Sequence, residues 1–311
     1  MNKRLHRRVL SAVLLTVALV FCLVPAQKSI VFGQQAGSKA DLTPTFWQRD
    51  PDAGFPDDGR MHCGPAAISD GLIYLARAYG LKDLVPGTEK KEDQIKLVEE
   101  LAEAFGTDPK KGGSNMDKII PGLQSYVKSK GYDFSRLELV IWRSVKDENN
   151  KFKIGSKPDI SWMRSAVRSK DTVVIFLFSW FDSKTEEDDY GARGGHYVIA
   201  VDAASDANEF TIHNPGLTSE KQSENKSVVL KILDEDFVVT RHTGEVNMKG
   251  YYEAEGPGLP HNMVAILDGV LVFSLKKHES EAQVNFVGNV PAMLGSFRSD
   301  VSKIAVAIPF N

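Results

Sequence analysis

Apolar residues recur at steps of three and four residues in the first half of the chain, the spacing of a helix with one face in a core. The clearest run begins at Cys63, has Pro65 in its first turn and ends at Gly80. Its apolar positions are Ile68, Leu72, Leu75, Ala76 and Tyr79. The same spacing predicts a second helix over residues 91–105.

Two further helices are predicted from the residues at their ends. In the third helix, Ser114 with Asp117 resembles a capping box, Pro121 predicts a bend and Gly131 predicts the end. The stretch "PDISWMRSAVRSKD" predicts a fourth, shorter helix capped near Asp159. The expected helices therefore all lie before residue 172.

The second half of the chain alternates short apolar runs with turn residues, which predicts strands. Residues 172–181 are apolar on both faces, as in a central strand, and the runs 194–202 and 209–216 follow. Weaker runs predict a strand at 137–144 and others beyond 225, at "SVVLKIL", "FVVTRH", "MVAILDGVLVFSLK", "VNFVG" and "KIAVAIPF". Helices first and strands later is the order of an α+β fold, not the alternating order of a parallel α/β fold.

The first 26 residues have the three-part layout of a secretory signal. A basic start is followed by the apolar run 9–24 and by Val24-Pro25-Ala26, a small-residue cleavage site. The apolar run is short for a membrane span, which needs about 20 residues. We therefore expect an exported protein, secreted or periplasmic, that meets a membrane only if this segment stays uncleaved.

Composition divides the rest of the chain. Residues 27–46 are polar without a period and predict a flexible spacer. Residues 47–225 carry the helices and the clearest strands, and form the expected main domain. Residues 226–311 are rich in predicted strands, which either extend the sheet of the same domain or form a small subdomain.

The charge balance excludes a nucleic-acid-binding protein. The chain has 38 Lys and Arg against 41 Asp and Glu, a formal net charge of −3. Because the leader removes four basic and no acidic residues, the exported chain would carry −7. Such a chain lacks the basic face that nucleic acid requires, and its acidic excess names no other partner.

Cys63 is the only cysteine outside the leader, because the other is Cys22. An unpaired cysteine in an exported protein indicates a reactive thiol, the alternative being a small buried side chain. At the start of a helix, the macrodipole and free N–H groups favour the thiolate and lower the pKa of the thiol. The sequence therefore predicts a nucleophile.

A thiol nucleophile needs an imidazole to hold its proton and a third group to orient the imidazole. His196 opens an apolar strand directly after Gly194 and Gly195, whose bare backbone would leave a groove for a substrate. Asn214 ends the next predicted strand and precedes a proline. Each motif alone also reads as a strand start or an Asn-Pro turn, but their combination and order favour a Cys-His-Asn triad.

These motifs carry a resemblance to a known family. "HCGPAAISDGLIYLA", "DTVVIFLF", "GGHYVIAVD" and "FTIHNPG" resemble those of the bacteriocin-leader (double-glycine) processing cysteine peptidases, and more closely their free-standing peptidase-like relatives in the papain clan. The resemblance covers residues 57–216. It implies Cys63 as nucleophile, His196 as general base and acid and Asn214 as orienting residue. It also implies a papain-like fold, with N-terminal helices packed on an antiparallel sheet.

The sequence departs from that family at the oxyanion donor. Family members place a Gln about six residues before the cysteine, where this chain has Asp57. An ionised carboxylate repels an oxyanion, and loss of one donor costs about 100- to 1,000-fold in turnover. Gln48 is the nearest upstream amide and would have to fold back through the intervening loop. Gly64, beside the nucleophile, leaves its backbone uncrowded and joins the two later glycines as a candidate groove residue.

We expect an exported cysteine peptidase that cleaves peptide or isopeptide bonds of a peptide or protein through a thioester, without a cofactor. Transfer of the acyl group to an amine would use the same triad. An inactive papain-like binding module is the alternative that Asp57 favours. Metal binding is the remaining alternative, but Cys63, His62, His196 and His213 lack a recognised ligand spacing.

Overall fold

The computed structural model describes residues 37–142, 152–182, 190–205, 207–218, 220–221, 226–241, 244–259 and 263–278. The predicted leader, the first ten residues of the spacer and the two strands expected after residue 283 lie outside these ranges. The fold is 34% helical and 33% strand, with most helices before the strands, and is therefore α+β.

The four predicted helices are present. The helices are α2 Lys39–Leu42, α3 Cys63–Tyr79, α4 Lys91–Ala104, α5 Met116–Ser129 and α6 Ile160–Arg168, with 3-10 turns η2 Pro51–Ala53, η3 Pro56–Gly59 and η4 Pro109–Lys111. Gly80 ends α3 in the left-handed conformation, as expected. None of the helices within the described ranges is long and apolar enough to span a bilayer.

The helix caps are partly as predicted. Asp159 accepts a hydrogen bond from the N–H of Trp162 at 2.9 Å and caps α6. The capping box expected for α5 is wrong, because the N-cap is Asn115 and its side chain makes no cap bond. Ser114 lies one residue too early and its hydroxyl bonds the Thr107 hydroxyl at 2.6 Å instead. Pro121 lies within α5.

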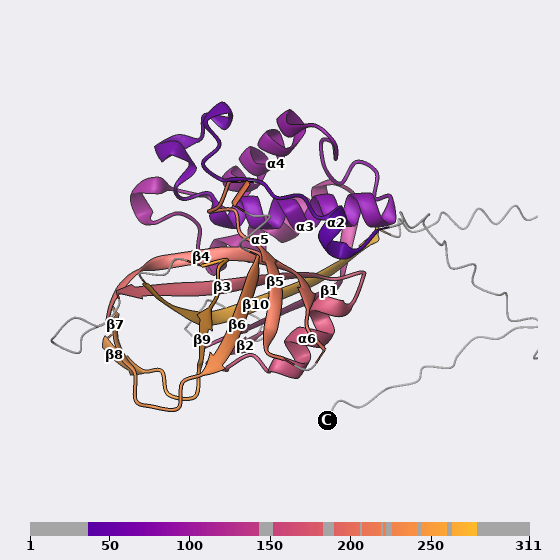
Figure 1. Cartoon of the computed structure of the whole chain (residues 1–311). Helices are drawn as coiled ribbons and strands as arrows, with labels where there is room; N and C mark the ends of the chain where they lie inside the picture. The colour runs from indigo at the N-terminus through magenta and orange to yellow at the C-terminus, as the bar shows by residue number, and fades with distance from the viewer. Residues whose placement is uncertain are drawn as a thin grey trace, which may run out of the picture. The chain divides into compact units, whose positions relative to one another are not determined.

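The strands close into a barrel (Figure 1). They are β1 Tyr132–Ile141, β2 Lys153–Ile154, β3 Val173–Asp182, β4 Tyr190–Ala203, β5 Glu209–His213, β6 Ser227–Ile232, β7 Val238–Arg241, β8 Gly244–Asn247, β9 Tyr252–Glu255 and β10 Met263–Lys277. Among the described strands, β3, β4, β5, β6, β9 and β10 pair antiparallel in that cyclic order. The ring closes because β10 pairs with β3 on one side and with β9, then β1, on the other.

The described strands β6, β9 and β10 therefore belong to the barrel itself. They supply half of its six strands, and β10 is the longest described strand at 15 residues. The short β2, β8 and β9 were not expected from the sequence. β5 ends at His213, earlier than the predicted end at residue 216, so that Asn214 follows the strand directly.

The two-sided apolar pattern of β3 reflects its position between two cores. Alternate residues of 173–178 face either the helices α3–α5 or the barrel interior, which α6 also covers. In Figure 1, α2, α3, α4 and α5 lie together on one side of the barrel. α3 lies directly on β3, because a Cβ added to Gly71 would be 2.5 Å from Cγ1 of Val173. This contact fixes the helix that carries Cys63 against the sheet that carries His196.

Candidate active site

Cys63 is the first residue of α3 and lies against β4. Its side chain is half-buried, and it accepts a backbone hydrogen bond from Tyr197, the residue after His196. The ring of Tyr197 packs on the same helix end, since a Cβ added to Gly64 would be 3.5 Å from it. Helix packing therefore brings the thiol to the strand segment that carries the imidazole.

The ionisation of this thiol differs from the sequence expectation. Burial raises the pKa of Cys63 above its ordinary value. Backbone hydrogen bonds from Tyr197, Gly64 and Cys63 itself lower that pKa, but burial has the larger effect. The helix N-terminus does supply N–H groups, as predicted, but their effect on the pKa of Cys63 is smaller than that of burial.

His196 and Asn214 form a hydrogen-bonded pair. Nε2 of His196 is 2.6 Å from Oδ1 of Asn214. The orientation of the Asn214 amide is fixed, because its Nδ2 donates to the carbonyl of Gly258 at 2.6 Å and its Oδ1 accepts the N–H of Gly216 at 2.8 Å. Nε2 of His196 therefore carries the hydrogen, and a neutral ring keeps its lone pair on Nδ1.

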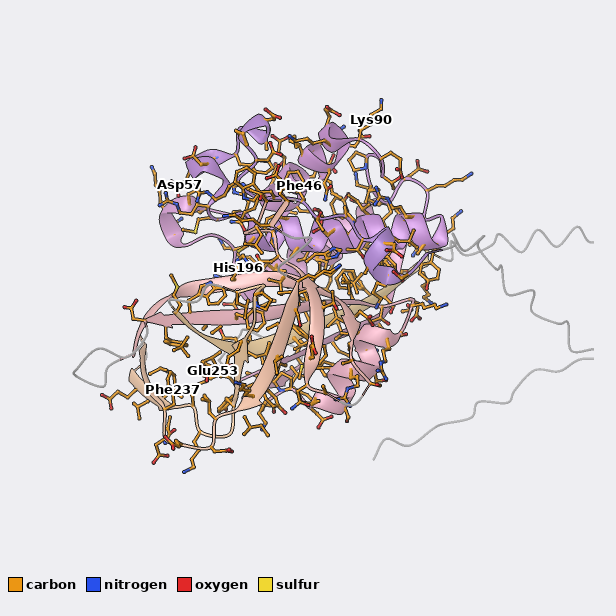
Figure 2. The ribbon with its side chains drawn as sticks, in the orientation of Figure 1. Phe46, Asp57, Lys90, His196, Phe237 and Glu253 are labelled. Carbon is orange, nitrogen blue, oxygen red and sulfur yellow. The ribbon has the colours of Figure 1, made fainter. Side chains whose placement is uncertain are left out.

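The surroundings of the imidazole favour its neutral form. Burial lowers the pKa of His196, while its bond to Asn214 raises it by less. Trp180 of β3 lies beside the ring, with centroids 5.6 Å apart and planes at 32°. Gly216 lies against the His196–Asn214 pair, where a side chain would crowd the ring, because an added Cβ would be 3.4 Å from Nε2 of His196. Figure 2 places His196 where the helical layer meets the barrel.

The two glycines before His196 expose backbone, as the sequence predicts. A Cβ on Gly194 would meet nothing within 4 Å, and one on Gly195 would meet only the Phe178 carbonyl, at 3.3 Å. Gly64 was grouped with them as a groove residue, but this assignment is wrong. Gly64 is buried, and Tyr197 and Ile119 occupy the space beside it, so that no room is left there for a substrate.

Neither of the two residues considered for the oxyanion site, Asp57 and Gln48, has a side-chain donor available to an oxyanion. Asp57 is exposed on a turn with φ of 53°, 3.9 Å from Arg60, and lies apart from His196 in Figure 2. Gln48 does fold back, as expected, and is 4% exposed. Its Nε2, however, donates to the carbonyls of Gly59 at 2.9 Å and Arg60 at 2.8 Å.

Two other histidines near the site have structural roles. His62 stacks on Phe55 with centroids 4.6 Å apart, and Nδ1 of His213 bonds the carbonyl of Pro44 at 3.0 Å. No group of three or more metal-ligating side chains occurs in the described ranges. Trp180 was not identified from the sequence, although the strand register that pairs it with Gly194 would have indicated it.

Comparison with known proteins adds no family. No protein-family model matches the chain, and no curated protein matches it. The geometry of the site is therefore the basis for assigning a function.

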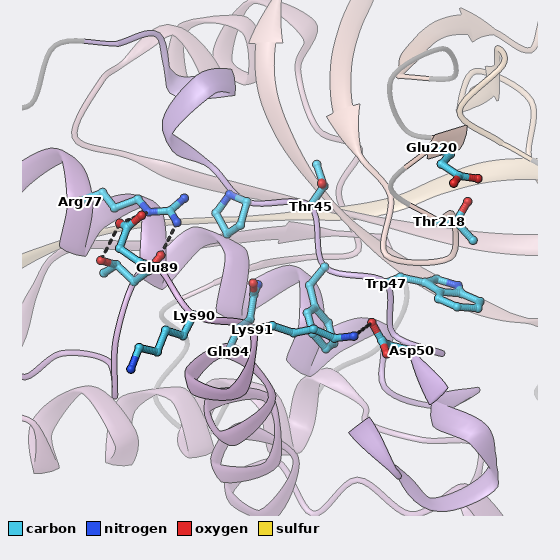
Figure 3. Close-up of a pocket in the computed structure, with 13 residues that line it drawn as sticks. Thr45, Trp47, Asp50, Arg77, Glu89, Lys90, Lys91, Gln94, Thr218 and Glu220 are labelled. Carbon is cyan, nitrogen blue, oxygen red and sulfur yellow. Dashed lines mark hydrogen bonds and ion pairs between the residues drawn. The ribbon is translucent and has the colours of Figure 1, made fainter. Parts of the chain in front are cut away.

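A cleft of about 520 Å³ adjoins the segment that leads to Gln48 (Figure 3). Its lining residues are Pro44, Thr45, Phe46, Trp47, Asp50, Arg77, Thr88, Glu89, Lys90, Lys91, Gln94, Thr218 and Glu220. Most of its charges are paired, Lys91 with Asp50 at 2.7 Å and Arg77 with Glu89 at 3.3 Å. None of Cys63, His196 and Asn214 lines this cleft, and its lining residues nearest to the site in sequence are Trp47, beside Gln48, and Thr218, four residues after Asn214.

Proposed function

We propose that the protein is a cysteine peptidase of papain-like fold that cleaves peptide or isopeptide bonds through Cys63, His196 and Asn214. The observation that carries the proposal is the 2.6 Å hydrogen bond between His196 and Asn214. Tyr197, the next residue of the same strand, donates its backbone N–H to the thiol of Cys63. A half-buried imidazole oriented by a fixed amide, on the strand whose next residue bonds a thiol at a helix N-terminus, is an arrangement suited to nucleophilic catalysis.

The chemistry starts from a neutral thiol and a neutral imidazole. Nδ1 of His196 takes the proton as the sulfur of Cys63 attacks the substrate carbonyl, and Asn214 stabilises the imidazolium that forms. The imidazolium then gives its proton to the leaving amine, which leaves a thioester on Cys63. Water activated by the same imidazole hydrolyses this thioester, and an amine in place of water would give acyl transfer.

The substrate is a peptide or protein segment. We assign substrate residues beyond the scissile bond to the cleft lined by Trp47 and Thr218, which are close in sequence to Gln48 and Asn214. Trp47 offers it an aromatic wall. The basic and apolar start of the sequence supports export of this enzyme from the cytoplasm.

An inactive binding module is the second candidate. Two observations favour it. The side-chain amide of Gln48 donates both of its hydrogens to backbone carbonyls, and burial raises the pKa of Cys63. An enzyme with these features has only backbone N–H groups for its oxyanion and little resting thiolate. Such a module would bind peptides in the same cleft without cleaving them.

A library of quenched fluorescent peptides tests the proposal. We expect cleavage by the wild type, loss of cleavage to background in Cys63→Ala and His196→Ala, and a loss of about 100-fold or more in Asn214→Ala. His278→Ala is the matched control, since His278 is exposed and bonds Asp133 far along the sequence from the triad. Cleavage that survives Cys63→Ala would disprove the proposal, and peptide binding without cleavage would establish the second candidate.

A further inference from the structure

Gln48 joins the two loops that carry the proposed catalytic residues. On one side, its Nε2 donates to the carbonyls of Gly59 and Arg60, which lead into Cys63. On the other side, its backbone N–H donates to the carbonyl of Pro215, which follows Asn214. These three bonds connect the entry to α3 with the exit from β5, so one residue spans both halves of the site.

The loop of residues 57–60, which Gln48 holds, has a backbone conformation that costs free energy. Asp57, Asp58 and Gly59 have φ of 53°, 48° and 67°, and a run of left-handed residues costs about 1 kcal/mol for each that is not glycine. A Cβ on Gly59 would lie 1.8 Å from the carbonyl oxygen of Gln48, so the two backbones are in direct contact. Such a turn persists only where its surroundings hold it, and the Gln48 amide supplies two of the holding bonds.

The amide of Gln48 has no hydrogen left for an oxyanion. Both hydrogens of Nε2 are used, and Oε1, which is buried, has no hydrogen-bond partner in the described part of the chain. An amide flip would turn Oε1 toward two carbonyl oxygens, which is repulsive. The side chain is therefore built into the loop and does not point its donors at a reacting carbonyl.

We infer that Gln48 is a positioning residue that clasps the Cys63 loop to the Asn214 loop, and not an oxyanion donor. This inference rests on the proposed function for its catalytic consequence, but not for the clasp itself. Release of the clasp would let residues 57–62 relax and would open the thiol to water. The thiol would then lose the burial that raises its pKa.

The test uses the full chain with Cys22→Ser, so that Cys63 is the only thiol. Gln48→Met keeps the length of the side chain and removes both amide bonds. We expect faster hydrogen exchange at residues 57–63, little change at 213–217, which the backbone N–H of residue 48 still bonds, and an alkylation–pH profile of Cys63 that moves toward the ordinary thiol value. Alkylation forms no oxyanion, so an oxyanion donor would not affect it. Peptide cleavage is expected to fall about 100-fold.

Tyr126→Phe is the matched control, because it removes one buried side-chain bond, to the carbonyl of Leu84 at 2.9 Å, without touching the site. It should lower stability while leaving the alkylation profile unchanged. Lost cleavage in Gln48→Met with unchanged exchange and alkylation would identify an oxyanion donor and overturn the clasp. Unchanged exchange at 57–63 would also overturn it, since the amide bonds of Gln48 would then not hold that loop. Failure of the proposed function appears separately, as cleavage that does not need Cys63 or as no cleavage by the wild type.

Discussion

At the scale of single residues, burial decides the protonation of the candidate triad. The helix N-terminus alone favours a thiolate at Cys63, but the sequence does not reveal how deeply Tyr197 and the start of α3 enclose the sulfur. The structure makes the thiol harder to ionise and His196 harder to protonate. The raised pKa of Cys63 and the lowered pKa of His196 both favour a neutral thiol and a neutral imidazole over a thiolate–imidazolium pair.

The reactivity of Cys63 should therefore rise only at alkaline pH. In the Cys22→Ser chain we expect the rate of reaction with iodoacetamide to have its inflection above about 8.5, the ordinary pKa of a thiol. The rate is measured against pH, with glutathione in the same buffers as reference. A plateau of fast reaction near pH 6 would contradict this prediction, because it would require a thiolate stabilised by protonated His196.

Asp70 is a buried acid that links three segments. It lies on α3, its Oδ1 accepts from Nε2 of Gln94 at 2.6 Å, and the backbone of Phe46 donates to it. Burial raises its pKa well above the ordinary value. The folded chain therefore keeps a proton that the unfolded chain releases above about pH 4, and the stability from protonated Asp70 is lost as the pH rises through the folded pKa.

Asp70→Asn, which cannot ionise, should remove this loss. We expect its free energy of unfolding to improve relative to the wild type as the pH rises above about 4, by roughly 1.4 kcal/mol for each pH unit in which the unfolded wild type has released the proton and the folded wild type still holds it. Urea unfolding at a series of pH values measures the difference. Asp83→Asn, on the exposed turn after α3, is the control, and parallel curves for Asp70→Asn and the wild type would refute the prediction.

At the scale of elements, the site depends on the close approach of α3 to the sheet. Gly71 faces β3, and a Cβ there would be 2.5 Å from Cγ1 and 3.1 Å from Cγ2 of Val173. Alanine is the better helix former by about 1 kcal/mol. In this position the overlap is the larger effect, because Val173 is fully buried and β-branched, and has no alternative place for its methyl groups.

Gly71→Ala should therefore lower the free energy of unfolding by about 1–3 kcal/mol in spite of its higher helix propensity. Denaturant unfolding measures the change, and peptide cleavage should fall with it because the thiol moves relative to β4. Lys96→Ala, on an exposed face of α4, should stay within about 0.5 kcal/mol of the wild type. Equal or greater stability of Gly71→Ala would show that helix and strand separate easily.

At the scale of the whole molecule, the sequence predicts which segments form helices and strands more readily than it predicts which of these segments contact one another. Periodicity is enough to place α3 and α4, and a run that is apolar on both faces marks β3 as central. The capping box predicted for α5 is absent because the hydroxyl of Ser114 bonds the hydroxyl of Thr107 instead. The triad is suggested by the order of its motifs, but the role of Gln48 depends on contacts with residues 11 to 167 positions away, which no local pattern encodes.

Barrel closure makes residues 227–277 essential to a site formed by residues 48–216. β10 joins β3 to β9 and also pairs with β1, so its removal leaves one edge of each of these three strands unpaired. A chain that ends at residue 225 contains the triad but lacks β6, β9 and β10, and we expect no cooperative thermal unfolding and no near-ultraviolet circular dichroism from it. A chain that ends at residue 278 retains every described strand and should give both signals. Cooperative unfolding of the shorter chain would mean that the helices with β3, β4 and β5 fold alone, and that the unpaired edges of β3 and β5 tolerate water.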